Sequence, residues 1–140
     1  MTNEQQVEIG KLFFEEGIPG FGHLQFFHLL QKEEGSPFFS LQSLEEEGVS
    51  FLVVDPFFFF SDYEFSLPVQ AKASLHIEAE DTAVMVVNIV TIRGENNITV
   101  NLKAPIVINQ NNRMAKQVIL NEENFEVRQP LFHKKAVGKE

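Results

Sequence analysis

Residues 83–92 read AVMVVNIVTI and residues 98–109 read ITVNLKAPIVIN, and together these two segments indicate a β-hairpin. The first is apolar at odd and even positions alike, which is typical of a central strand covered on both faces. The second alternates apolar and polar side chains along most of its length, which predicts an antiparallel strand with one exposed face. Because only five residues connect the segments, we expect a hairpin. Pro105 has no amide hydrogen, so the second strand is expected to lie at a sheet edge or to carry a bulge there.

Shorter segments of the same kind lie on both sides of this hairpin. Their apolar patterns predict strands at residues 7–13, 26–30, 38–44, 50–54 and 114–120. Turn-forming residues separate these segments, as in GIPGF at residues 17–21, where glycines permit unusual backbone angles and proline fixes φ.

Helical patterns are few and short. Residues 66–76 read as one helix, with Ser66 as its N-terminal cap and Pro68 in its first turn. A weaker helical pattern spans residues 122–127. We therefore predict an all-β protein, a small antiparallel β-barrel or pseudobarrel with one or two short helices.

The length of 140 residues suits one domain with a single core. We expect this β domain to span residues 1–132 and a mobile C-terminal tail to occupy residues 133–140. The chain has no cysteine, which excludes disulfide bonds and thiolate zinc sites and fits a reducing compartment. Its first residues lack the pattern of a secretory signal, and no apolar run approaches the roughly 20 residues of a membrane-spanning helix. A cytoplasmic protein is therefore expected.

The charge is unevenly distributed along the chain. Of the net charge of −9, residues 1–92 contribute −12, from fifteen acidic and three basic residues, and residues 93–140 contribute +3. Nucleic-acid binding through the first part is disfavoured because phosphate contacts need Lys and Arg. The acidic part favours a basic protein partner, although solubility alone is a common reason for such charge. We expect no direct contact with nucleic acid and none with a membrane.

The segment VVDPFFFFSDYEF at residues 53–65 places four consecutive phenylalanines between acidic residues. Successive side chains of a strand point to opposite faces, so four adjacent rings cannot all enter one core. Either the segment is a strand covered on both faces, which is the simpler interpretation for most of the rings, or some rings stay at the surface. Surface rings flanked by carboxylates would suit docking to another protein.

Two further features have both a structural and a functional interpretation. The run Glu45–Glu47 is most simply a solvated turn, and it would also steer a basic partner. The loop at residues 17–21 is most simply a structural turn, and Ile18 and Phe21 at its tip would also serve as anchors for a partner. The candidate partner-binding residues are Ile18, Phe21, Glu45, Glu46, Glu47, Asp55, Phe57, Phe58, Phe60, Asp62 and Tyr63.

Catalytic motifs are missing from the sequence. No zinc-protease, nucleotide-binding or nucleophile-elbow pattern occurs, and the four histidines lack metal-site spacing, so no metal or cofactor is expected. Asp55, Asp62 and Glu64 would form a carboxylate cluster suited to acid–base chemistry, although turn capping and solvation are simpler roles. The alternative function is therefore a β-barrel enzyme or small-ligand-binding protein that uses these three residues.

Several blocks of the sequence, in this order and between residues 7 and 132, resemble the flagellar assembly factor FliW family. The matching blocks are FEEGIPGF (14–21), SPFFSLQS (36–43), FLVVDPF (51–57), DYEF (62–65), TVNLKAPIVIN (99–109), AKQVIL (115–120) and RQPL (128–131). Two features depart from the family pattern: the connection at residues 93–97 is short, and the unbroken run of rings at 57–60 is more aromatic than usual.

The resemblance implies a cytoplasmic, non-enzymatic protein with a small all-β pseudobarrel, either a monomer or a weak homodimer. FliW-like proteins bind newly made flagellin and, in its absence, the RNA-binding translational repressor CsrA. Bound CsrA no longer represses flagellin messenger RNA, so flagellin synthesis and export are coupled. The acidic part of this chain fits such a role, because an RNA-binding protein presents basic surface.

Overall fold

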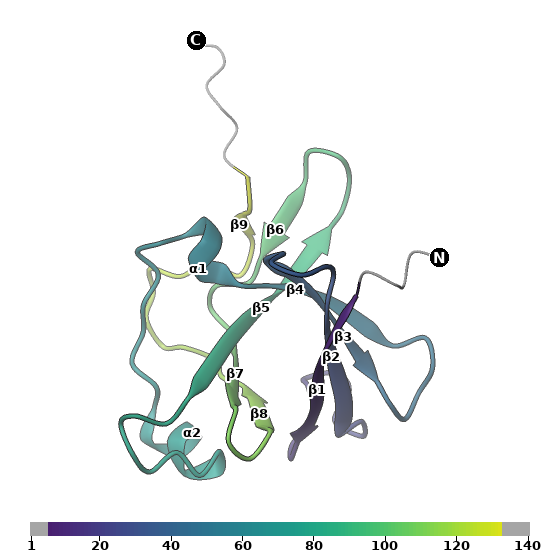
Figure 1. Ribbon diagram of the computed structural model, residues 1–140. Coiled ribbons are helices and arrows are strands. Elements are labelled where there is room, and N and C mark those ends of the chain that lie inside the picture. The colour runs from purple at the N-terminus through teal and green to yellow at the C-terminus, as the bar shows by residue number, and fades with distance from the viewer. Residues whose placement is uncertain (1–5, 133–140) are drawn as a thin grey trace.

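The computed structural model describes residues 6–132 of the chain (Figure 1). The tail predicted at residues 133–140 lies outside the described residues. In chain order the elements are β1 (Val7–Phe14), β2 (Phe26–Gln31), β3 (Phe38–Ser43), β4 (Ser50–Val54), α1 (Pro56–Phe59), α2 (Val69–Ser74), β5 (Val84–Ile92), β6 (Ile98–Val100), β7 (Ile106–Asn109), β8 (Met114–Gln117) and β9 (Gln129–Pro130).

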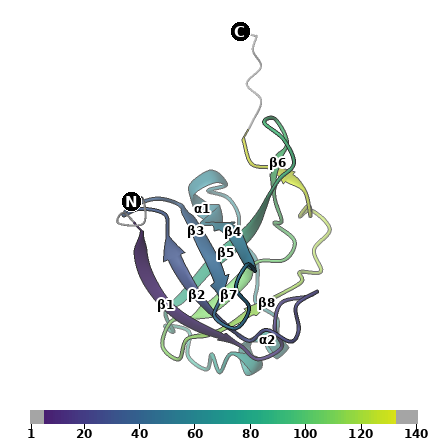
Figure 2. The ribbon, with the colours of Figure 1, turned by 90° about the vertical axis from the view of Figure 1, so that its right-hand side faces the viewer.

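The strands form a closed barrel, as the sequence patterns predict. Seven strands follow one another in the order β4-β3-β2-β1-β8-β7-β5, and pairing of β4 with β5 closes the ring. Neighbouring strands are antiparallel except β1 and β8, which run parallel over two residue pairs. β6 and β9 extend the sheet beyond the barrel from the far end of β5. Figures 1 and 2 show them near α1, at the end of the molecule opposite α2.

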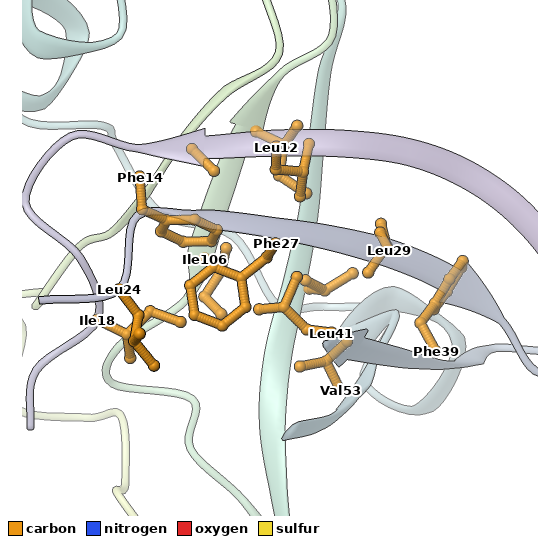
Figure 3. Close-up of a cluster of buried hydrophobic side chains, with 13 residues drawn as sticks. Leu12, Phe14, Ile18, Leu24, Phe27, Leu29, Phe39, Leu41, Val53 and Ile106 are labelled. Carbon is orange, nitrogen blue, oxygen red and sulfur yellow. The ribbon is translucent and has the colours of Figure 1, made fainter. Parts of the chain in front are cut away.

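Alternation along the strands fills the interior of the barrel. In β2, Phe27 and Leu29 are fully buried, whereas Phe26 is exposed and His28 only partly buried. Phe14 of β1 meets Phe27 edge to face, with ring centroids 5.2 Å apart, a geometry that adds about 1 kcal/mol to the burial of the two rings. Figure 3 shows these side chains converging with those of neighbouring strands and of the loop after β1.

Each short helix covers a smaller apolar cluster outside the barrel. Val54, Tyr63 and Leu131 belong to the cluster beneath α1, and Leu75 and Val118 to the cluster beneath α2. The end of α2 is held by a buried side chain, because Asn109 Nδ2 donates a hydrogen bond of 2.8 Å to the Leu75 carbonyl. That bond satisfies a carbonyl that the helix itself leaves free.

The expectation of one continuous strand over residues 98–109 is wrong. Asn101 Oδ1 accepts hydrogen bonds from the amides of Lys103 and Ala104, both at 3.1 Å, and these bonds turn the chain. Pro105 follows and has no amide hydrogen for a ladder. The segment therefore forms two strands, β6 and β7, which pair with β5 on either side of the turn. β7 is buried on both faces rather than half exposed.

The helical expectations are also corrected. The helix predicted from Ser66 begins only at Val69, with Pro68 as its N-cap, because the residue before a proline is disfavoured in helical conformation. Residues 122–127 form turns and extended chain instead of a second helix. Two hydrogen bonds hold this backbone to residues 102 and 103: Leu102 N donates to the Glu126 carbonyl, and Lys103 Nζ donates to the Glu122 carbonyl.

Candidate functional site

The run of four phenylalanines is a helical turn, so the interpretation as a strand covered on both faces is wrong. Asp55 caps this turn, because its carboxylate accepts a hydrogen bond of 3.0 Å from the amide of Phe57. Pro56 stands at the first helical position, where it has no ladder bond to lose. The turn ends at Phe60, whose amide donates to the Pro56 carbonyl at 2.8 Å. Successive side chains of a helix point about 100° apart, so the rings fan out in different directions.

The fan leaves two rings in solvent and places two against the protein. Phe57 is 43% exposed and Phe58 is 67% exposed, whereas Phe59 and Phe60 pack on the cluster beneath α1. Phe132, which follows β9, is 55% exposed and meets Phe59 edge to face at 5.7 Å. We call the exposed rings of Phe57, Phe58 and Phe132 the aromatic ridge; Phe59 lies between Phe58 and Phe132 and contacts both.

A buried polar contact supports the ridge from below. Tyr63 is almost fully buried and its ring centroid lies 5.8 Å from that of Phe57. The Tyr63 hydroxyl donates a 2.7 Å hydrogen bond to the Leu102 carbonyl and accepts one of 3.3 Å from Asn88 Nδ2. Burial raises the pKa of Tyr63 to about 12, despite the bond from Asn88. Tyr63 therefore fixes the base of the ridge and is not part of its exposed surface.

The carboxylates near the ridge have different roles. The Asp55 carboxylate is engaged in capping α1, which confirms the simpler of its two expected roles. Asp62 and Glu64 are exposed to solvent. Among residues 6–132, no group of three or more His, Asp or Glu side chains is arranged to hold a metal ion. The ridge thus combines exposed rings with nearby negative charge, a surface suited to contact with another molecule.

The loop at residues 17–21 contributes to the core instead of forming an exposed tip. Ile18 is 2% exposed and lies among the side chains of the barrel interior (Figure 3). Phe21 is partly buried, packs on the same cluster and meets Phe51 edge to face at 5.3 Å. The loop closes tightly, since the Phe21 amide donates to the Ile18 carbonyl at 2.6 Å. Ile18 therefore has no exposed surface with which to anchor a partner.

The three glutamates of the β3–β4 turn divide into one structural and two surface residues. The Glu45 carboxylate accepts hydrogen bonds from the backbone amides of Phe26 and Gln25, at 3.0 and 2.6 Å, and these bonds lower the pKa of Glu45. Glu46 lies 3.3 Å from His23 Nε2, and Glu47 is exposed. This turn precedes β4 and the ridge follows it, so the strand, about 15 Å long, separates the two.

Sequence reasoning missed exposed apolar side chains at the ridge and at the acidic turn. Phe132 completes the ridge, and Phe26 and Leu44, 44% and 46% exposed, lie side by side at the acidic turn, where Leu44 N donates to the Phe26 carbonyl. The adjacent pair Phe26 and Phe27 could have predicted an exposed ring, because neighbouring side chains of a strand face opposite sides and only one can enter the barrel. No local sequence pattern predicted the exposure of Phe132, because its position depends on the pairing of β9 with β6.

No helix within residues 6–132 is long and apolar enough to cross a membrane.

Comparisons with known proteins give a consistent result. A family model described as FliW protein matches residues 1–131. A curated relative from Clostridium kluyveri, named flagellar assembly factor FliW, is 42% identical over 120 residues, which cover 85% of this chain and 82% of the relative. A relative of the same name from Bacillus velezensis is 40% identical over 127 residues, covering 89% and 88% of the two chains. A crystal structure of the flagellar assembly factor FliW matches with a TM-score of 0.83 at 39% identity, over 90% of this chain and 88% of that one.

Proposed function

This chain belongs to the FliW family, and we propose that it is a cytoplasmic flagellar assembly factor that acts by binding other proteins. Its partners in this proposal are flagellin and the translational repressor CsrA. Flagellin competes for the assembly factor, so that free assembly factor is available to antagonise CsrA only when flagellin has been exported. The protein has no catalytic step in this scheme.

The aromatic ridge is the observation that supports the proposal best. Large apolar rings dominate the binding energy of protein interfaces, and here Phe58 is 67% exposed in the free protein. The ridge is also ordered before any partner arrives, because the cap at Asp55 and the buried Tyr63 hold its helical turn in place. A preformed apolar surface binds with less loss of side-chain entropy. We therefore assign flagellin docking to the ridge.

Charge supports contact with CsrA. An RNA-binding repressor presents basic surface to its messenger RNA, and this chain carries a net charge of −12 over residues 1–92. Glu46, Glu47, Asp62 and Glu64 are all exposed to solvent, where their charge acts on a partner. Carboxylates held beside the repressor attract its basic surface and repel RNA phosphates, so they weaken RNA binding without filling the RNA site.

The test of the ridge compares Phe58→Ala with Phe26→Ala. Phe26 is a matched control, because it is also an exposed ring but lies at the opposite end of β4 from the ridge. Affinity for purified flagellin is measured by titration calorimetry and folding by urea denaturation. We expect Phe58→Ala to weaken flagellin binding by about 2 kcal/mol, roughly 30-fold, and to change the free energy of unfolding by less than about 1 kcal/mol.

The control should keep the flagellin affinity of the unchanged protein. Equal losses of binding in the two variants would remove the ridge from the proposal. A Phe58→Ala variant that loses as much folding free energy as binding free energy would assign the ring to the core instead.

A further inference from the structure

The outer edge of β8 is only partly covered by its neighbour. β1 pairs with it at Phe13↔Met114 and Phe14↔Ala115, and β1 ends there. The opposite edge of the same chain continues its ladder, since Val118 N donates to the Pro105 carbonyl and Leu120 N to the Lys103 carbonyl. The chain is therefore extended for several residues beyond the point at which β1 leaves it.

Two residues on this outer edge have free backbone groups. Backbone groups of successive residues in an extended chain point to opposite sides, so those of Gln117 and Ile119 point away from the ladder that Val118 and Leu120 make. Neither the amide nor the carbonyl of Gln117 or Ile119 is hydrogen-bonded to any residue between 6 and 132. The Ile119 side chain is 63% exposed. This is the unpaired strand edge on which another strand can add.

The free edge faces a groove of about 430 Å³. One wall comes from the loop after β1, with Glu16 and Pro19, and the other from the start of α2, with Pro68 and Ala71. In Figure 2 that loop lies beside β8 and α2, which agrees with this arrangement. An ion pair of 2.6 Å between Lys116 Nζ and Glu16 Oε1 joins the loop to β8. The groove therefore has backbone donors and acceptors along one side.

We propose that this groove binds an extended peptide segment of a partner protein, which adds as a strand to the edge at Gln117 and Ile119. Residues 117 to 121 span about 13 Å, so the bound part of the segment is about four to six residues long. Main-chain hydrogen bonds to Gln117 and Ile119 hold it, and its apolar side chains contact the groove.

The charge around the groove selects a basic segment. Lys116 is neutralised by Glu16, whereas Glu15, Glu122 and Glu123 are exposed close to the groove or to its last lining residue, Asn121. Lys103 is a nearby cation, and its Nζ donates to the Glu122 carbonyl, so the carboxylates still outnumber the ammonium groups. A second copy of this chain would bring the same carboxylates to the contact and be repelled. The occupant is therefore an extended segment of alternating apolar and basic residues from a different protein. The proposal goes beyond the proposed function, since it holds whether or not that protein is flagellin or CsrA.

The test removes one free amide without disturbing any internal bond. Ile119→Pro deletes an amide hydrogen that the folded protein does not use, whereas Ile119→Val keeps both the amide and the extended conformation. The probe is a fluorescent peptide of sequence KVTVKVTVK, and its affinity is measured by fluorescence anisotropy. We expect the unchanged protein and Ile119→Val to bind it equally and Ile119→Pro to bind at least ten-fold more weakly.

A measurement on the unchanged protein gives an independent result that does not depend on folding of the proline variant. Amide exchange of Gln117 and Ile119, followed by NMR, should slow at least ten-fold when the peptide is added. The proposal is overturned if the peptide does not bind, if Ile119→Pro binds it as well as Ile119→Val, or if a dimer of the chain already protects these amides. Flagellin and CsrA are titrated separately into the unchanged protein, so failure of the proposed function is seen independently of the groove.

Discussion

Replacing Tyr63 by Phe tests the support of the aromatic ridge. The substitution keeps the ring, whose centroid lies 5.8 Å from Phe57 and 5.2 Å from Phe125, and removes only the hydroxyl. The Leu102 carbonyl then loses the donor that lies 2.7 Å away, inside a cluster of buried apolar side chains. An unsatisfied buried acceptor costs about 1–3 kcal/mol, and we expect Tyr63→Phe to lower the free energy of unfolding at pH 7 by about 2 kcal/mol.

The difference between the two proteins should depend on pH with a definite sign. The pKa of Tyr63 is about 12 in the folded protein, against 10.0 for a tyrosine in solution. Above pH 10 the unfolded chain releases the phenolic proton while the folded protein still holds it, so alkali destabilises the folded state. Each pH unit between the two pKa values then removes about 1.4 kcal/mol of stability that the phenylalanine variant never had. The advantage of tyrosine should be complete below pH 10 and lost as the pH rises through 12.

Urea denaturation of the two proteins at pH 7 and pH 11 measures this loss. We expect the advantage of about 2 kcal/mol at pH 7 to fall to about 0.6 kcal/mol at pH 11. Because other groups that titrate in alkali are the same in both proteins, their effects cancel in the difference. An advantage that stays constant from pH 7 to pH 11 would show that the Tyr63 hydroxyl is not held in a protected, hydrogen-bonded site.

Two further predictions concern the loop after β1 and the acidic turn. Gly17 has φ of 70° and a Cβ there would lie 2.6 Å from Gly22 Cα, so Gly17→Ala should lower the free energy of unfolding by about 3 kcal/mol or more. Gly20 has φ of 90° and open space around it, so Gly20→Ala should lower the free energy of unfolding by only about 1 kcal/mol, as measured by thermal or urea unfolding. Equal losses of stability in the two variants would contradict the close approach of Gly17 to Gly22 within the loop. The affinity of the unchanged protein for CsrA should fall at least ten-fold between about 0.05 M and 0.5 M salt. At one salt concentration, the double variant Glu46→Lys/Glu47→Lys should bind CsrA more weakly than Glu33→Lys/Glu34→Lys, which makes the same change of charge on the β2–β3 turn. Equal affinities of these two variants, or a salt-independent affinity, would exclude electrostatic attraction at the β3–β4 turn.

The sequence predicted the strands well where local signals agree. β4 was placed at residues 50–54 without error, and β2 and β3 to within one residue at their ends, because apolar alternation stops at clear turn residues. The strand pairing that closes the barrel could not be predicted from such local signals. It depends on contacts between Val53 and Ile89 and between Val54 and Asn88, which are distant in sequence and leave no periodic pattern.

The errors occur where one side chain outweighs a longer pattern. Asn101 interrupts an alternation that otherwise runs to Ile108, because its carboxamide bonds to two amides that the ladder would have used. Asp55 overrides the strand preference of the run of phenylalanines. Aromatic residues favour strands, but here Asp55 caps a helix that begins at Pro56. In both cases the deciding residue could be seen in the sequence. The sequence did not show that its side-chain hydrogen bonds would outweigh the strand pattern around it.

The Asp55 carboxylate, whose strength as a helix cap the sequence interpretation underestimated, creates the surface on which the proposed function depends. In a strand, the rings of residues 57–60 would alternate between two faces, and closure of the sheet would bury at least one face. The helical turn set by Asp55 instead directs Phe57 and Phe58 outward while Phe59 and Phe60 attach the turn to the cluster below. Exposing two rings forfeits about 25 cal/mol for each Å² of apolar surface left in water, a loss that the fold must offset elsewhere. Tyr63 packs against Phe57, Phe65 and Phe125 and bonds to the Leu102 carbonyl, so the pH dependence of Tyr63 reports on the packing beneath the ridge.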